Sequence, residues 1–146
     1  MRTFIILLLS CASTLGGETL VHLKSGETNM VSYALDCVVS DSRSGTNASP
    51  GADLVLTVRN NGAKWIGTQD VSVEDFSLRD AKGHDVKIWR GSATSSGIGY
   101  GNICIIHLLV AEPKALQPWT LQFKSKPKNM VSIDLTITDI EPRKKQ

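Results

Sequence analysis

Residues 131–138, VSIDLTIT, decide the fold, because apolar and polar side chains alternate along them without interruption. Val131, Ile133 and their later counterparts fall on one side, and hydroxyl and carboxyl side chains fall on the other. Successive side chains of an extended chain point to opposite faces, so this order gives one face to a core and one to solvent. On a helix the same residues would scatter around the axis. The stretch is therefore predicted to be a half-buried β-strand.

The same two-residue period recurs in residues 31–39, 54–58 and 119–123, which are predicted to be strands of the same kind. Shorter strands are expected at residues 86–89 and 19–23. Together these segments indicate several short strands that share one core.

Two segments depart from clean alternation. In residues 71–78 the apolar register slips, and an extra residue near Glu74 and Asp75 predicts a β-bulge there. Residues 103–110 are apolar almost throughout, with His107 as the polar interruption, which predicts a central strand covered on both faces.

The connecting segments carry turn signals. Residues 60–62 (NNG) contain residue types that accept positive φ, and residues 80–83 (DAKG) are predicted to close a tight hairpin. Residues 41–52 and 91–102 are rich in small and polar residues and are predicted to be loops. Seven or eight short strands joined in this way predict an all-β protein, an antiparallel immunoglobulin-like β-sandwich, with a small closed barrel as the alternative.

The N-terminus is typical of a secretion signal. A positive start is followed by the apolar run 4–9 and then by small residues, so residues 1–17 are expected to be a signal peptide. The apolar run is far shorter than the roughly 20 residues that span a bilayer, and no transmembrane helix is predicted. The expected organisation is a sandwich domain at 18–140 followed by a basic tail at 141–146.

An alternative interpretation of the N-terminus is lipidation. The sequence LLSC ending at Cys11 resembles the lipobox of bacterial lipoproteins, in which the cysteine carries the lipid. The protein is thus expected to be secreted or periplasmic, or else anchored to a membrane through Cys11. The net charge of the chain is only +2, and its one cluster of basic residues is 143–145. The absence of a larger basic face argues against a nucleic-acid partner.

Two cysteines remain in the predicted domain. Side-chain parity places Cys37 and Cys104 on the inward faces of distant strands, where they could meet across the core. A disulfide between them would stabilise the fold by roughly 4 kcal/mol in the loop-entropy model. The alternative is two separate buried thiols that behave as small hydrophobic side chains.

No motif for a catalytic centre, a cofactor or a bound metal is found, so the protein is expected not to be an enzyme. His22, His84 and His107 lie far apart and have no ligand at a typical metal spacing. The glycines of 97–101 precede a strand rather than a helix, which excludes a phosphate-binding loop.

Three segments carry a family resemblance. They are LVLTVRNNG at 54–62, DFSLRDAKG at 75–83 and PWTLQF at 118–123. Between about residues 52 and 140 the chain resembles the secreted bacterial immunoglobulin-like domains of telokin-like type. The resemblance implies export, one sandwich and often a lipidated cysteine, and it brings no shared catalytic residue.

The expected function is that of an exported, non-enzymatic module that binds another protein or a component of the cell envelope. The candidate surface is the 91–102 loop with a sheet edge, and its candidate contact residues are Ile98, Tyr100 and Trp89. The alternative is a small-ligand or carbohydrate carrier that uses exposed Trp65, Trp89 or Trp119. Burial in the core is nevertheless the first expectation for Trp65 and Trp89.

Overall fold

The computed structural model describes residues 18–28, 30–40, 52–67, 72–94, 97–110, 117–125 and 130–142. The expected signal peptide with Cys11, the interior of the 41–52 loop and the basic cluster 143–145 therefore lie outside the described residues.

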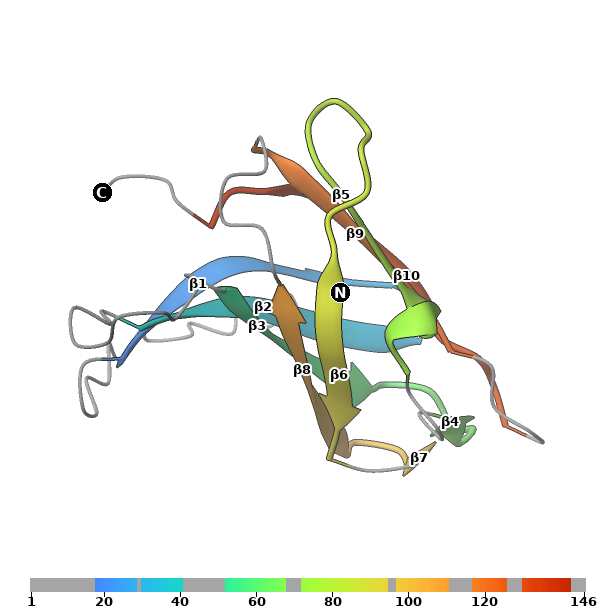
Figure 1. The fold of residues 1–146 in the computed structure, drawn as a ribbon. Helices are drawn as coiled ribbons and strands as arrows, with labels where there is room; N and C mark the ends of the chain where they lie inside the picture. The colour runs from blue at the N-terminus through green and yellow to red at the C-terminus, as the bar shows by residue number, and fades with distance from the viewer. Residues whose placement is uncertain are drawn as a thin grey trace.

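The protein is all-β and folds as an antiparallel β-sandwich, which confirms the predicted fold class (Figure 1). A five-stranded sheet of order β1-β2-β3-β8-β6 packs against a three-stranded sheet of order β10-β9-β5, and the short strands β4 and β7 pair at one end. The elements are β1 (Glu18–Glu27), β2 (Val31–Ser40), β3 (Ala52–Asn60), β4 (Ile66–Gly67), the 3-10 helix η1 (Val73–Asp75), β5 (Phe76–Arg79), β6 (Ile88–Ala93), β7 (Gly97–Ile98), β8 (Ile103–Val110), β9 (Trp119–Lys124) and β10 (Asp134–Ile140).

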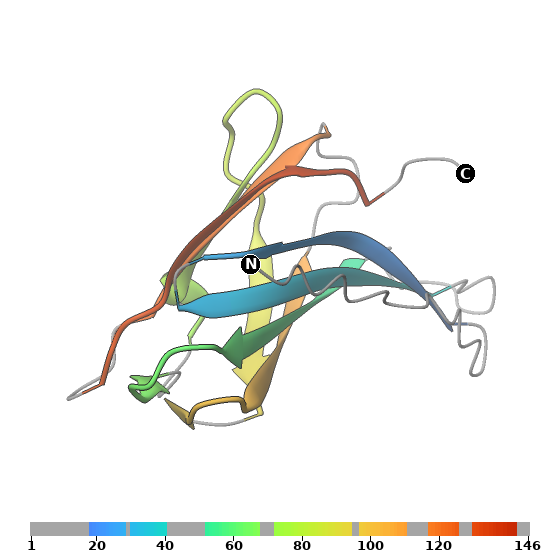
Figure 2. The same ribbon diagram turned by 180° about the vertical axis from the view of Figure 1, so that it is seen from behind.

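The five-stranded sheet is strongly twisted. In Figures 1 and 2 β1 runs across the view, whereas β6 at the opposite edge runs upright. This is the accumulated twist of neighbouring strands. The three-stranded sheet lies across the concave side, so the core is enclosed between the two layers.

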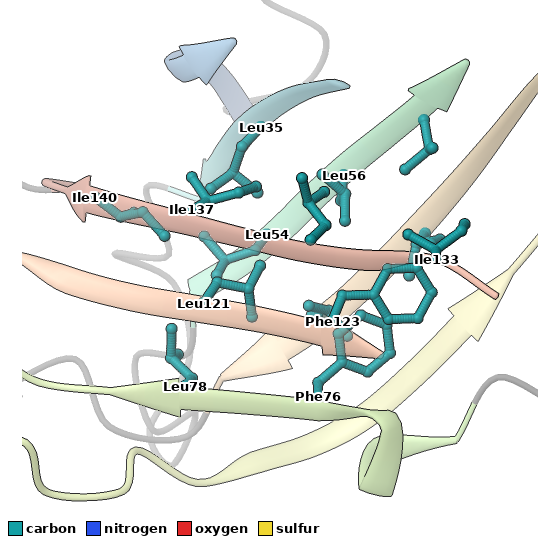
Figure 3. Packing of buried hydrophobic residues seen from close by; sticks show 14 of the residues in the cluster. Leu35, Leu54, Leu56, Phe76, Leu78, Leu121, Phe123, Ile133, Ile137 and Ile140 are labelled. Carbon is teal, nitrogen blue, oxygen red and sulfur yellow. The ribbon is translucent and has the colours of Figure 1, made fainter. Parts of the chain in front are cut away.

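The core consists of the inward rows of both sheets. Leu54, Leu56 and Val58 of β3 are buried, as the two-residue period predicts. They face the inward row of β9, where Phe123 stacks on Phe76 of β5 with ring centroids 4.5 Å apart (Figure 3). Each such side chain contributes about 1.5–3 kcal/mol on burial.

Two predictions about individual segments are wrong. The irregularity in 71–78 is a turn of 3-10 helix, η1, followed directly by β5, rather than a bulge within one strand. An Asp75 carboxylate accepts a hydrogen bond from the Ser72 amide at 2.9 Å, which caps the turn. The 91–102 segment is only partly a loop, because β6 extends to Ala93 and β7 occupies Gly97–Ile98.

The strand β8 is central, but the described residues cover only one of its faces, which corrects the prediction that both faces are covered. It lies between β3 and β6, and alternate residues from Cys104 to Val110 are buried. The intervening residues point outward, and Ile103 is 53% exposed. The apolar composition of β8 thus predicted a second layer over its outer face, which the described part of the chain does not provide.

The predicted disulfide is also wrong, because both cysteines belong to one sheet. Cys37 pairs with Leu54 and Cys104 pairs with Val58, so β3 lies between them. Two strand spacings and four residues along the strand separate their Cα atoms by about 16 Å. A disulfide needs at most about 7 Å. The structure has two buried thiols, as the alternative expected.

The chain crosses from the three-stranded to the five-stranded sheet through the predicted turn at residues 80–83. The Asp80 carboxylate accepts hydrogen bonds from the amides of Lys82 and His84, at 2.8 and 2.9 Å. Gly83 has a φ of 81°, which its missing side chain permits. Beyond the turn, the Val86 amide donates to the Leu78 carbonyl before β6 begins.

Candidate functional site

The end of the sandwich beside β4 and β7 is organised by one buried side chain. Asn60, the last residue of β3, is fully buried, and its amide nitrogen donates to the carbonyls of Lys64 and Ile98, both at 2.8 Å. Its side-chain oxygen accepts from the Gly62 amide at 2.8 Å. A buried amide without these partners would cost about 1–3 kcal/mol for each unsatisfied group. Asn60 therefore fixes the 60–66 loop against β7.

The backbone of Asn60 fixes the second loop of this end. Its amide donates to the Asn102 carbonyl at 3.0 Å, and its carbonyl accepts from the Gly101 amide at 2.8 Å. The Asn102 amide in turn donates to the Gly99 carbonyl at 3.1 Å, which closes a tight turn over Tyr100 and Gly101. Gly101 has a φ of 76°, a conformation that favours glycine.

Trp65 lies on the surface of this end, against two glycines of the neighbouring segment. A Cβ added to Gly99 would lie 3.3 Å from Trp65 Cζ2, and one added to Gly97 would lie 3.4 Å from Trp65 Cε3. Glycine therefore allows the indole to approach the backbone of 97–99 closely. Trp65 is nevertheless 61% exposed, so much of the ring is available to a partner.

Tyr100 is presented at the tip of the adjoining turn and is 75% exposed. It follows Gly99, at which an added Cβ would lie 3.3 Å from Trp65 Cζ2, so the two exposed aromatic residues lie at the same end of the sandwich. We call Trp65 and Tyr100, with the loops that carry them, the aromatic end. The prediction that Tyr100 is accessible agrees with this placement.

The structure separates the other predicted contact residues from Tyr100. Ile98 is 0% exposed and points into the core, so its assignment to a binding surface is wrong. Trp89 is 49% exposed in the bulge of β6, beside the Leu109 end of β8. The strand β8 spans about 20 Å between Ile103 and Leu109, so Trp89 lies at the far end of the sheet from Tyr100.

The burial of Trp65 and Trp89 is the reverse of what the sequence predicted. Trp65 and Trp89 were expected in the core and are exposed, whereas Trp119 is 1% exposed and packs between the sheets. Trp119 is therefore unavailable to a ligand. The two remaining tryptophans lie on different parts of the molecule.

Each histidine lies beside an aspartate, and for His22 and His107 the sequence spacing does not reveal the partner. His22 Nδ1 lies 2.7 Å from Asp36, and the corresponding distances are 3.5 Å for His84 with Asp80 and 3.8 Å for His107 with Asp53. The first and third pairs join different strands, so only the sheet register brings their members together. Within the described residues no three potential ligands gather to hold a metal ion.

The pKa of Asp80 lies below its ordinary value. Partial burial raises the pKa, but the amide hydrogen bonds from His84 and Lys82 and the nearby His84 imidazole lower it by more. This carboxylate is a structural acceptor in the turn rather than a proton donor.

Among the depressions lined by described residues, two are shallow and have no tryptophan in their lining. One, of about 210 Å³, lies between β5 and the following segment. The other, of about 240 Å³, lies on the outer face of the five-stranded sheet, between Asp53 and Arg90. The described part of the chain contains no helix long and apolar enough to cross a membrane.

Comparison with known proteins gave no family model, no curated protein and no solved structure that matches this chain. The resemblance to telokin-like domains stays a prediction that rests on the three segments quoted above.

Proposed function

We propose that this protein is an exported, non-enzymatic module whose aromatic end binds another protein or a component of the cell envelope. The observation that supports this most is the exposure of Trp65 and Tyr100 on loops that a buried, hydrogen-bonded Asn60 holds in place. Large aromatic side chains on a fixed backbone bind with little loss of conformational entropy, and they dominate many interfaces.

The carrier alternative has less support. A carrier of small ligands uses a concave, largely apolar pocket. Trp119 is buried, and Trp65 and Trp89 lie on different parts of the surface, so the described residues bring no two tryptophans together around one ligand. A protruding aromatic surface fits a macromolecular partner better than an enclosed small molecule.

The binding test compares tryptophans in two places. The tagged protein is used to capture partners from an envelope extract of its source cells, and the variants Trp65→Ala and Tyr100→Ala are compared with Trp89→Ala. Each of the first two is expected to weaken capture five- to thirtyfold, as the loss of an interface anchor of about 1–2 kcal/mol requires. Trp89→Ala, an equally large truncation outside the aromatic end, should leave capture unchanged. Equal capture by all four proteins would refute the proposal.

Export is tested by the intact mass of the protein recovered outside the cytoplasm. Removal of the N-terminal segment supports secretion, and an added diacylglycerol mass on Cys11 supports anchoring. Full-length protein confined to the cytoplasm would contradict both.

A further inference from the structure

Exposed apolar side chains gather at the end of the sandwich that carries Trp65 and Tyr100. Seven large apolar side chains are exposed among the described residues, and four of them, Met30, Trp65, Tyr100 and Ile103, lie at this end. Figure 2 shows the start of β2 and the end of β3 on the same side of the molecule as β4 and β7. Apolar side chains that gather in this way on a surface indicate a contact site.

The strand β3 connects Met30 and Ile103 to the aromatic end. The Met30 carbonyl accepts a hydrogen bond from the Asn61 amide at 2.8 Å, directly after the residue that ends β3. Ile103 begins β8 and pairs with Arg59, the residue before Asn60. Met30 and Ile103 therefore border the aromatic end, one on each side of β3.

The side chains of this end suit the interface between lipid and water. Trp65 and Tyr100 stand on turns, so they project from the molecule rather than line a flat sheet face. Each combines an apolar ring with one polar group, and such residues favour the depth of the lipid headgroups. A lipid surface can deform around projecting side chains, whereas a protein partner would need cavities shaped to receive them.

The charges of the same turns fit an anionic lipid surface. Residues 27–31, 59–66 and 98–103 contain two cations, Arg59 and Lys64, and one anion, Glu27. Both cations are exposed. The Glu27 carboxylate accepts a hydrogen bond from the Asn61 side-chain amide at 3.3 Å, so it has a partner within the chain. A cation beside an anionic bilayer strengthens binding by about fivefold.

We propose that the aromatic end inserts into the headgroup region of an anionic lipid bilayer. Trp65 and Tyr100 enter the interface, and Arg59 and Lys64 lie beside the lipid phosphates. This inference rests on the proposed function, because it names a lipid surface as the envelope component that the aromatic end binds. Binding is reversible, since only a few side chains enter the bilayer.

Tryptophan fluorescence on vesicles with brominated acyl chains tests which end of the molecule enters the lipid, because bromine quenches only a nearby indole. The vesicles contain phosphatidylcholine and phosphatidylglycerol in equal amounts. Trp89→Phe leaves Trp65 with the buried Trp119, and the matched variant Trp65→Phe leaves Trp89 with the same Trp119. Trp65 should be quenched and should emit at a shorter wavelength, whereas Trp89 should change little.

Quenching of Trp89 in place of Trp65 would overturn the proposal. The strand β1 begins at Glu18, which pairs with Ser40, whereas Glu27 at its other end pairs with Ser32 beside the aromatic end. Trp89 lies at the same end of the sheet as Glu18, remote from Trp65. Contact with lipid through the N-terminal segment alone would therefore affect Trp89 first.

Sedimentation with vesicles measures how strongly each variant binds lipid. Trp65→Ala and Tyr100→Ala should each weaken binding by about fivefold or more, because a ring no longer enters the interface. Trp89→Ala is the control and should bind as the unaltered protein does. Lys64→Gln should weaken binding to the anionic vesicles by about fivefold and leave binding to pure phosphatidylcholine unchanged. All variants carry the same N-terminus, so its own affinity for lipid cancels.

Two outcomes separate this inference from the proposed function. If no variant binds vesicles but capture from a detergent-solubilised extract still depends on Trp65, the lipid partner is overturned and a protein partner remains. If neither vesicle binding nor capture depends on Trp65, the proposed function fails as well. Equal vesicle binding by Trp65→Ala and Trp89→Ala would also overturn the lipid partner, and far-ultraviolet dichroism confirms that both variants are folded.

Discussion

The strands β8 and β9 occupy equivalent positions, each with a neighbouring strand on both sides, yet their outer rows differ completely. The outward residues of β9 are Thr120, Gln122 and Lys124, whereas β8 presents Ile103, Ile105 and Leu109 around His107. Their inward rows are alike, apolar and buried. The inward rows enclose the core, so the outward rows of the two strands are free to differ in composition.

The largest effects should come from the inward rows, where the two strands are alike. Phe123→Ala removes a ring stacked on Phe76 and should lower the free energy of unfolding by about 3–5 kcal/mol. Ile106→Ala on β8 should cost about 2–5 kcal/mol for the same reason. Urea unfolding measures both. If one substitution cost less than about 1 kcal/mol, the two inward rows would not be equivalent.

A second pair of variants sharpens the comparison where each sheet buries a polar residue. Asn60 ends β3 with three side-chain hydrogen bonds, whereas Ser125 follows β9 and accepts one, from the Ile133 amide at 2.7 Å. Asn60→Ala should therefore cost about 3 kcal/mol and Ser125→Ala about 1 kcal/mol. Thermal unfolding compares them, and equal losses would show that Asn60 does not fix its loops as described.

The outer rows should matter little for the stability of the monomer. Leu109→Thr makes β8 resemble β9 and should cost no more than about 1 kcal/mol, because Leu109 is already partly exposed. Gln122→Ile makes β9 resemble β8 and should change stability by less than about 0.5 kcal/mol. Urea unfolding measures both changes in stability. A loss near that of Phe123→Ala would mean that the outer row of β8 belongs to the core.

The smallest effect concerns the turn that joins the two sheets. Because the pKa of Asp80 is lowered on folding, its charged form stabilises the turn above the ordinary aspartate pKa, and this contribution disappears as pH falls through the lowered value. Asp80→Asn should therefore unfold more easily than the original protein near pH 7 and equally easily in strong acid. Melting temperatures across this range provide the measurement, and a constant difference at every pH would contradict the assignment.

Side-chain parity was sufficient to predict the sandwich. The alternating segments place Leu35, Leu56, Leu121 and Ile137 in the core, because the burial of one face is a local property of an extended chain. Parity also predicted that Cys37 and Cys104 point inward. It could not tell that both lie in one sheet, since strand order depends on contacts distant in sequence.

The candidate site was less predictable for related reasons. A large apolar residue such as Trp65 is usually buried. Its indole is exposed here because Gly97 and Gly99 let one side of the ring pack against their backbone. Ile98 occurs in a glycine-rich segment that conceals a two-residue strand, so its burial was missed. The aspartate partners of His22 and His107 depend on register, which no short sequence spacing encodes.

The single amide of Asn60 has a consequence for transplanting this surface. Because Asn60 holds the 60–66 loop and Ile98 through its side chain and the turn at 99–102 through its backbone, the two loops form a module that includes its own anchor. Residues 98–102 grafted alone into another scaffold would lack the hydrogen bonds from Asn60 and should lose their conformation. A graft that also includes residues 60–66 would retain these bonds. Natural variation is subject to the same condition, since an insertion in either loop must preserve the distance to the shared amide.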